Sequence, residues 1–392
     1  MGDPHRAASA ASAGKGLADV VAASTEISDI DGQAGVLSYR GYDIHDLAGQ
    51  VSFEECAYLL HRSELPNQDQ LRQYASELHA GRDTGPTVEA VLATSVANRP
   101  PMEALRTLVS ALSADDVDTS SNDGAANARK AARLVAQMPV LVAAYQARRN
   151  GNAAPPAEAD LGIAGNLLLQ ITGKRPDPTA VAVLDECLVL HADHTMNAST
   201  FAARVCAATL SDMHSAVTGA IGTLKGPLHG GANEQVMKLL EELVDRIDRT
   251  PGADLRDEAA QAVRARLDAG QKIMGFGHRV YRGEDPRATH LRKMSQSLGE
   301  LAGDMRWYDI SAELERAVFE AKGLRPNVDF YAASVYHYLG IPTDLFTPVF
   351  AVSRMSGWTA HVIEQHADNR LIRPESEYIG PGPRKPFPLD QR

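Results

Sequence analysis

The hydrophobic residues of this chain recur mostly at intervals of three and four positions, the spacing that gathers them on one face of a helix. Ser, Asn, Gly or Pro bounds each such run, as is common at helix ends. Four runs show the pattern most clearly: SFEECAYLLHR (52–62), NQDQLRQYASELHAG (67–81), ANARKAARLVAQMPVLVAAYQARR (126–149) and NEQVMKLLEELVDRI (233–247). The pattern predicts a fold made almost entirely of packed α-helices.

One short stretch departs from this periodicity. The segment GQAGVLSYRGYDI (32–44) places glycines around a brief apolar run, and it predicts a small β-hairpin. Pro-rich and Gly-rich turns recur along the rest of the chain, without a long linker or an internal repeat. Composition alone therefore marks no domain boundary.

The composition agrees with a helical protein and narrows its function. Of the 392 residues, 44% are hydrophobic but only 5% are aromatic, which favours helices packed through small side chains. The net charge of −11 argues against a nucleic-acid-binding surface, because such surfaces need a basic field. No apolar stretch reaches the roughly 20 residues that cross a bilayer, so no membrane span is predicted.

The cysteines and the N-terminus bear on the compartment. Cys56, Cys187 and Cys206 are widely spaced and form no CxxC pair, which is typical of reduced thiols inside a cell. The opening MGDPHRAASAASAGKG lacks the apolar core of a secretory signal, and we expect residues 1–18 to be a flexible tail. A cytoplasmic protein is therefore expected.

The first candidate for chemistry is LHADHTMNAST (190–200). If the helix that begins near Thr179 continues through Leu188, His191 lies on its apolar face and His194 follows three residues later. We therefore expect both histidines to line one pocket. Two alternatives stay open: core histidines with satisfied hydrogen bonds, or a metal site, although no HExxH or CxxC motif completes a familiar ligand set.

The second candidate is KGPLHGGANE (225–234), which places His229 between a Gly-Pro turn and a Gly-Gly pair. A helix that starts near Gly231 directs free N–H groups and a positive dipole end toward this loop. The loop therefore suits an anion or a developing oxyanion. A purely structural turn is the alternative, because glycine-rich turns precede many helices that have no chemical role.

The third candidate, KIMGFGHRVYRGEDPRA (272–288), combines three glycines with His278 and three arginines. It is too polar and too rich in glycine for an ordinary core helix, and it resembles an anion-binding loop. Val280 stands where a GxGxxG motif needs its third glycine, and GxxxxGK[ST] occurs nowhere in the chain. Neither a dinucleotide fingerprint nor a P-loop is supported.

Two later segments add an acid and two arginines. Asn327 and Asp329 precede an apolar helical run, and by themselves they are typical of a helix N-cap. Arg354 interrupts the apolar stretch TPVFAVSRMSGWTAH (347–361), and a buried arginine needs a paired acid or a bound carboxylate. Arg373 follows beside a proline, where a surface salt bridge is the alternative.

Together these motifs resemble the citrate synthase family in order and approximate spacing: LHADHTMNAST, KGPLHGGANE, MGFGHRVYR with DPRA, NVDF and SRMSGWTAH. The resemblance runs from about Gly35 to Pro374. It implies an all-α, two-domain subunit that forms a homodimer, with a large domain (1–224 and 336–392), a smaller mobile domain (225–335) and the active site between them. The extra N-terminal domain of NADH-regulated hexameric members is not evident, so a dimer without that control is expected.

The resemblance also implies a reaction, the condensation of acetyl-CoA with oxaloacetate and water to give citrate and CoA. Asp329 matches the family's base, which removes a proton beside the thioester carbonyl. His229 matches the donor to the thioester oxygen, and His278 matches the group that polarises the oxaloacetate carbonyl. Acetyl-CoA is a substrate, so neither a separate cofactor nor a metal is expected.

The remaining matched residues are implied ligands of the two substrates. Arg287 and Arg354 match arginines that clamp the carboxylates of oxaloacetate, and His194 matches a further contact. Arg373 resembles the arginine that reaches into the neighbouring subunit's site, so the active sites are expected to be shared, while His191 is expected behind the ligand-facing residues. The implied contacts to CoA are Lys272, Gly275, Phe276, Gly277 and Arg282.

Two other functions remain open at this point. The same motifs occur in 2-methylcitrate synthases, which use propionyl-CoA, although LHADHTMN resembles citrate synthases more. A nonenzymatic protein that binds dicarboxylates or CoA on the same scaffold would keep Arg287 and Arg354, but it would not need Asp329.

Overall fold

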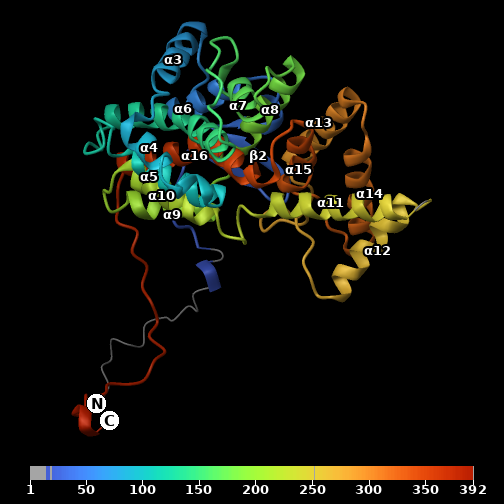
Figure 1. Cartoon of the computed structure of the whole chain (residues 1–392). Coiled ribbons are helices and arrows are strands. Elements are labelled where there is room, and N and C mark those ends of the chain that lie inside the picture. Colours follow the sequence, from blue (N-terminus) through green and yellow to red (C-terminus); the bar gives the residue numbers. More distant parts are fainter. Residues whose placement is uncertain (1–14, 18–19, 251, 392) are drawn as a thin grey trace.

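The computed structural model describes residues 15–17, 20–250 and 252–391, and most of the predicted tail (1–18) lies outside these residues. The regular structure within them is overwhelmingly α-helical (Figure 1), which confirms the predicted fold class. Across the same three ranges, no helix combines the length and the apolar character that crossing a bilayer requires.

The main body is the larger of the two groups of helices in Figure 1 and holds most of the core. Within the described residues, it has ten longer helices and one short one. Their bounds are α1 Ile44–Leu47, α2 Phe53–Arg62, α3 Gln68–Ala80, α4 Gly85–Leu92, α5 Pro101–Leu112, α6 Gly124–Arg149, α7 Gly162–Thr172, α8 Pro178–His191, α9 Ala198–Ala207, α10 Met213–Leu224 and α16 Phe346–Ala367. Short 3₁₀ turns lie at Lys15–Leu17, Ser95–Asn98, Thr343–Leu345 and Leu389–Gln391.

Helix α16 is the centre of this body. It contacts α2, α5, α6, α8, α9 and α10, and nearly all of its side chains are buried. Apolar residues on all sides of a helix indicate such a central position. Arg354 lies in the middle of α16, so the apolar stretch around it correctly predicted that this arginine is buried.

A second group of helices lies to one side of the body (Figure 1). It comprises α11 Ala232–Arg249, α12 Leu255–Asp268, α13 Pro286–Ala302, α14 Arg306–Lys322 and α15 Val328–Tyr338. These helices pack mainly on one another, while α13 touches α8 and α11 touches α16. The predicted smaller domain (225–335) coincides with this group, but its boundaries and mobility stay predictions.

The predicted hairpin is part of a three-stranded antiparallel sheet, β1 Ser28–Asp31, β2 Val36–Tyr39 and β3 Tyr42–Asp43. Strand β1 lies before the predicted range. It was not predicted because its sequence, SDID, is mostly polar and shows no apolar strand pattern. The hydroxyl of Tyr39 donates to the carbonyl of Asp193 at 2.9 Å. The sheet is therefore attached to the loop that follows α8.

Candidate active site

A cavity of about 1150 Å³ lies between the main body and the second group of helices. Its wall contains six of the predicted site residues: His194, His229, His278, Arg287, Asp329 and Arg354. They come from segments that span 160 positions of sequence, so only the tertiary fold brings them together.

His229 lies in the loop between α10 and α11, and its ring is fixed by Ser199. The Nε2 atom of His229 lies 2.8 Å from Ser199 Oγ and accepts the Ser199 N–H at 3.3 Å. In the neutral ring the proton is therefore on Nδ1. Burial, with a smaller effect of Arg354, lowers the pKa of His229 to about 4, so the ring is neutral at pH 7.

The glycines beside His229 have a steric function. A Cβ atom on Gly230 would lie 2.4 Å from the carbonyl oxygen of Leu224, which is closer than any side chain permits. The α11 helix begins at Ala232, as the sequence predicted, directly after this close approach. The Gly-Gly pair thus lets the loop fold tightly against the end of α10 with the imidazole of His229 at the cavity.

His278 and His194 form a second imidazole pair. The Nδ1 atom of His278 accepts the backbone N–H groups of Val280 at 3.0 Å and Tyr281 at 3.3 Å, which leaves the proton of the neutral ring on Nε2. The His194 ring meets that of His278 edge-on at 5.1 Å, and its Nε2 lies 3.2 Å from the Tyr281 hydroxyl. Burial and the charge of Arg287 lower the pKa of His278 to about 4.

Asp329 is positioned by the first turn of α15. Asn327 is the N-cap, as the sequence indicated, and its side chain accepts the Asp329 N–H at 3.0 Å. Among the described residues, no hydrogen bond or ion pair reaches the Asp329 carboxylate. Burial raises its pKa to about 6, although Arg287 and Arg354 act in the opposite direction. The result is a free carboxylate that is more basic than an ordinary aspartate.

Backbone pairing places His278 and Asp329 in one wall. The Asn327 N–H donates to the Gly275 carbonyl at 2.9 Å, and the Asn327 side-chain amide donates to the Gly277 carbonyl at 2.9 Å. Both glycines have positive φ, 84° and 74°, which the tight loop requires. Asn327 therefore caps the helix that carries Asp329 and also holds the loop that carries His278.

The two arginines in the cavity differ in their partners. The Nε of Arg354 donates to the His191 carbonyl at 2.8 Å, and its guanidinium lies 4.7 Å from the centre of the Phe350 ring. Within the described parts of the chain, Arg354 has no acid at ion-pair distance, and burial lowers its pKa to about 10. An almost fully buried guanidinium without an acid is the arrangement that suits a bound carboxylate.

Arg287, in contrast, already has an acid partner in Asp285. Two hydrogen bonds join them, Nε to Oδ1 at 2.9 Å and Nη2 to Oδ2 at 2.7 Å. Asp285 also accepts the Val328 N–H at 3.1 Å, so it holds Arg287 beside the start of α15. Asp285 was not among the predicted site residues, although an Asp-Pro pair before a helix is a recognisable cap.

Of the two histidines that helical spacing allowed in one pocket, only His194 lines the cavity, and His191 lies behind it, as the family resemblance implied. Helix α8 ends at His191, and Thr195 adopts a left-handed backbone conformation (φ 46°) that directs the chain toward the cavity. His191 lies behind Arg354, with Nδ1 3.2 Å from the Tyr336 hydroxyl. As for a metal site, the described residues contain no group of three or more His, Cys, Asp or Glu side chains arranged to hold an ion.

Other predicted contacts lie away from the cavity wall. Lys272 and Arg282 are exposed, and Phe276 packs its ring 4.4 Å from that of Phe330. Arg373 is exposed on the extended segment after α16, which runs away from the body (Figure 1). A role for these residues in binding CoA or in a neighbouring subunit therefore stays a prediction.

Judged over the described residues, this cavity holds a basic carboxylate without a hydrogen-bond partner, two neutral imidazoles each with one N–H donor, and an arginine without an acid. Such a set defines an acid–base enzyme that acts on an anionic substrate. The family model described as "Citrate synthase, C-terminal domain" matches residues 16–375. The chain belongs to the citrate synthase family, whose members are acyltransferases.

Relatives and solved structures agree with this family. Citrate synthase 2 of Bacillus subtilis is 48% identical over 96% of this chain and 99% of its own length. The 2-methylcitrate synthase of Shewanella oneidensis is 42% identical over 97% of this chain and 98% of its own. A structure of Thermoplasma acidophilum citrate synthase, in ternary complex with carboxymethyl coenzyme A and oxaloacetate, superimposes with a TM-score of 0.86, at 30% identity and coverage of 96% and 99%.

Proposed function

We propose that this chain is a citrate synthase, which condenses acetyl-CoA with oxaloacetate and water to give citrate and CoA. The observation that carries this proposal is the Asp329 carboxylate, which is free, partly desolvated and in one cavity with two imidazole donors. A protein that only bound dicarboxylates would have no use for a free base beside its arginines. The Thermoplasma complex, which holds oxaloacetate together with a carboxymethyl derivative of coenzyme A, supports the same assignment.

The first step is proton transfer from the carbon beside the thioester carbonyl to Asp329. A carboxylate with a pKa near 6 is a better acceptor for this weakly acidic proton than an ordinary aspartate. As the proton leaves, negative charge develops on the thioester oxygen. The Nδ1–H of His229 stabilises that oxygen, since Ser199 already engages Nε2.

The second step joins the enol carbon to the carbonyl carbon of oxaloacetate. The Nε2–H of His278 polarises that carbonyl and gives its proton to the new alkoxide, because two backbone N–H groups occupy Nδ1. Water then hydrolyses the thioester and releases CoA. No separate cofactor or metal takes part in this scheme.

Oxaloacetate is held by its two carboxylates. Among the described residues, Arg354 supplies a guanidinium without an acid partner, Arg287 supplies the nitrogens that Asp285 leaves free, and His194 adds an imidazole. CoA is proposed to lie along the 272–282 segment, where Lys272 and Arg282 are exposed cations suited to its phosphates.

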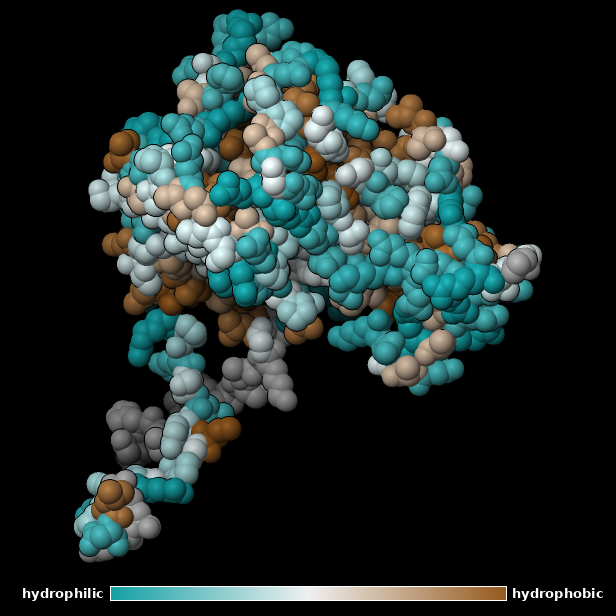
Figure 2. Space-filling view, viewed as in Figure 1, coloured by the Kyte–Doolittle hydropathy of each residue, from teal (hydrophilic) through white to brown (hydrophobic). Residues whose placement is uncertain are grey.

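We further propose a homodimer in the cytoplasm, in which Arg373 of one subunit completes the partner's site. Helix α10 presents Ser215, Gly219 and Gly222 to solvent, so another helix can approach its backbone closely. Hydrophobic residues gather along the edge of the body beside α9 and α10 (Figure 2), and Leu210 there is 61% exposed. An uncovered apolar edge of this kind favours association with a second copy.

The second candidate is a 2-methylcitrate synthase, which the Shewanella relative keeps open. One additional methylene changes selectivity by only about 1–3 kcal/mol, so family membership does not separate the two. The test is oxaloacetate-dependent CoA release with acetyl-CoA and propionyl-CoA side by side. We expect the higher kcat/KM with acetyl-CoA. A preference for propionyl-CoA would reassign the enzyme, and no CoA release with either would refute the proposal.

A further inference from the structure

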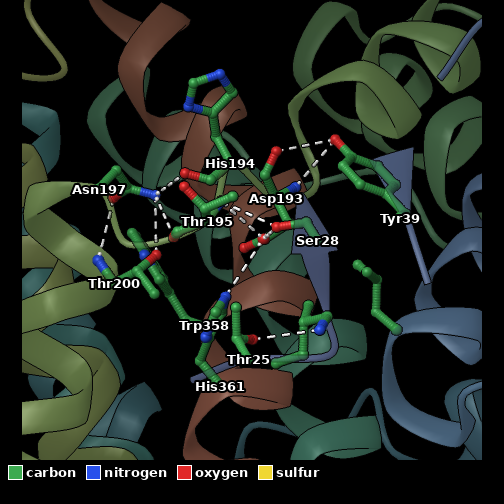
Figure 3. A network of polar contacts seen from close by, with 12 residues as sticks. Thr25, Ser28, Tyr39, Asp193, His194, Thr195, Asn197, Thr200, Trp358 and His361 are labelled. Carbon is green, nitrogen blue, oxygen red and sulfur yellow. Dashed lines mark hydrogen bonds and ion pairs between the residues drawn. The ribbon is translucent and has the colours of Figure 1, made fainter. Parts of the chain in front are cut away.

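The loop 192–197 carries His194 into the cavity in a conformation that needs support (Figure 3). Thr195 follows His194 directly and has φ 46°, a region that β-branched residues avoid. Such a residue costs about 1–3 kcal/mol and persists only where its surroundings hold it. The groups that hold Thr195 therefore also determine where the His194 ring lies.

A buried carboxylate oxygen and the Ser28 hydroxyl oxygen share that support, because the Thr195 N–H donates to Ser28 Oγ at 3.0 Å as well as to Asp193. Oδ2 of Asp193 accepts the Ser28 hydroxyl at 2.5 Å and the Thr195 N–H at 3.1 Å, and it lies 3.3 Å from His361 Nε2 (Figure 3). Burial raises the pKa of Asp193, but His361, Arg354 and Ser28 together hold it below its ordinary value. Asp193 therefore remains an anion that accepts the N–H of the strained residue.

The orientation of His361 is set from its other side. Its Nδ1 lies 3.1 Å from Nη1 of Arg204, and an arginine can only donate. The ring must accept at Nδ1, so its proton is on Nε2 and points at Asp193. Arg204 is itself held by Glu364 at 2.5 Å and by Gln365 at 3.0 Å.

The same helix that carries His361 also carries Arg354. Between them on α16, Gly357 faces the loop so closely that a Cβ atom there would lie 2.3 Å from the Ala192 carbonyl and 2.5 Å from Asp193 Oδ1. Arg354 and the loop that bears His194 are therefore joined through one rigid helix, and their spacing depends on its contact with Asp193.

We propose that Asp193, His361 and Arg204 form a positioning relay that fixes His194 relative to Arg354 and thereby sets the affinity for oxaloacetate. This inference depends on the proposed function only in that the ligand is taken to be oxaloacetate. The three side chains are 0–4% exposed and none lines the cavity, so they act through His194 and not by touching substrate. A misplacement of about 1 Å at such a position can cost about a hundredfold.

The test compares His361→Leu, which removes both contacts, with His361→Gln, whose amide offers one acceptor and one donor. We expect His361→Leu to raise the oxaloacetate KM and Kd at least tenfold, while the acetyl-CoA KM at saturating oxaloacetate changes less than about twofold. His361→Gln should recover most of the oxaloacetate affinity. Ser295→Ala, which breaks an equally buried hydrogen bond to Ser334 far from the loop, should lower thermal stability without changing either KM.

The relay would be overturned if His361→Leu changed the oxaloacetate KM and the acetyl-CoA KM equally. It would also be overturned if the loss of activity merely matched the loss of folded protein. If His361→Leu does not fold, His361→Asn replaces it, because its shorter side chain cannot bridge Asp193 and Arg204. Calorimetry with oxaloacetate separates this inference from the proposed function: wild-type protein that binds oxaloacetate but releases no CoA refutes only the latter. Wild-type protein that binds no oxaloacetate refutes both.

Discussion

Replacing Arg354 by methionine should weaken oxaloacetate binding severely while leaving the ligand-free protein about as stable as before. Burial of the charged group lowers the pKa of Arg354 from its ordinary value to about 10, and at 1.36 kcal/mol per pKa unit this shift corresponds to roughly 3 kcal/mol. A base with a depressed folded-state pKa destabilises the protein at every pH below that value. The cost is thus fully present at pH 7 and is lost only as the pH rises from about 10 toward the ordinary pKa of an arginine.

Methionine removes this cost but also removes two favourable contacts of Arg354. The hydrogen bond to the His191 carbonyl contributes about 1.5–3 kcal/mol, and the contact with the Phe350 ring about 0.5–2 kcal/mol. Gains and losses nearly cancel, so we expect the free energy of unfolding in urea to change by no more than about 1–2 kcal/mol. Oxaloacetate binding should weaken by about 2–5 kcal/mol, or roughly 30-fold to 4,000-fold in Kd.

Arg204→Met is the matched control for the effect on folding stability only, because the proposed relay predicts that this variant also binds oxaloacetate more weakly. Arg204 is also buried, at 4% exposure, but it is paired with Glu364 and His361. Its removal should destabilise the protein by about 3–5 kcal/mol, because the acid loses its counter-charge. Urea denaturation without ligand and calorimetry with oxaloacetate measure the two effects separately. If Arg354→Met is as destabilising as Arg204→Met, Arg354 already has a stabilising partner and the reasoning is refuted.

Two further predictions follow from the site. Asp329→Asn should lower kcat by about 10²–10⁴ and leave the oxaloacetate Kd nearly unchanged. In the wild type, kcat/KM should fall below pH 6 because Asp329 takes up a proton. His229 and His278 stay neutral down to about pH 4, so they do not cause this fall. A flat pH profile from 7 to 5 would assign the base elsewhere. Arg373→Leu and Asp329→Asn homodimers should each be nearly inactive, whereas equal co-refolding should leave about half the dimers mixed and about a quarter of all sites intact. Verified mixed dimers as inactive as their parents would show that Arg373 does not act across the interface.

The sequence predicted those parts of the site that local patterns encode. His229 and His278 stand in glycine-rich loops where no packing requirement explains a histidine, and Arg354 interrupts an apolar helix where only a buried role fits. The hairpin and the start of α11 were likewise visible in turn residues. Each of these features depends on neighbours within a few positions.

Contacts between distant segments were not visible in the same way. Ser199 orients His229 from 30 positions away, and Asp193 meets His361 across 168 positions. No periodicity or motif in a single sequence encodes such pairs. Helical spacing alone put His191 in the pocket for a related reason: it was extended beyond the residue at which α8 ends, without the turn at Thr195, whereas the family resemblance placed His191 behind the ligand-facing residues.

The unpaired groups in the cavity explain why the order of events matters in the proposed reaction. Arg354 has a charge without an acid, and Asp329 has a raised pKa that two nearby arginines partly lower. Two carboxylates of bound oxaloacetate would neutralise the arginines and add negative charge near Asp329, and both effects raise the pKa of a carboxyl group further. Asp329 therefore becomes a stronger base once oxaloacetate is bound. Binding of oxaloacetate thus prepares the carboxylate that removes a proton from acetyl-CoA.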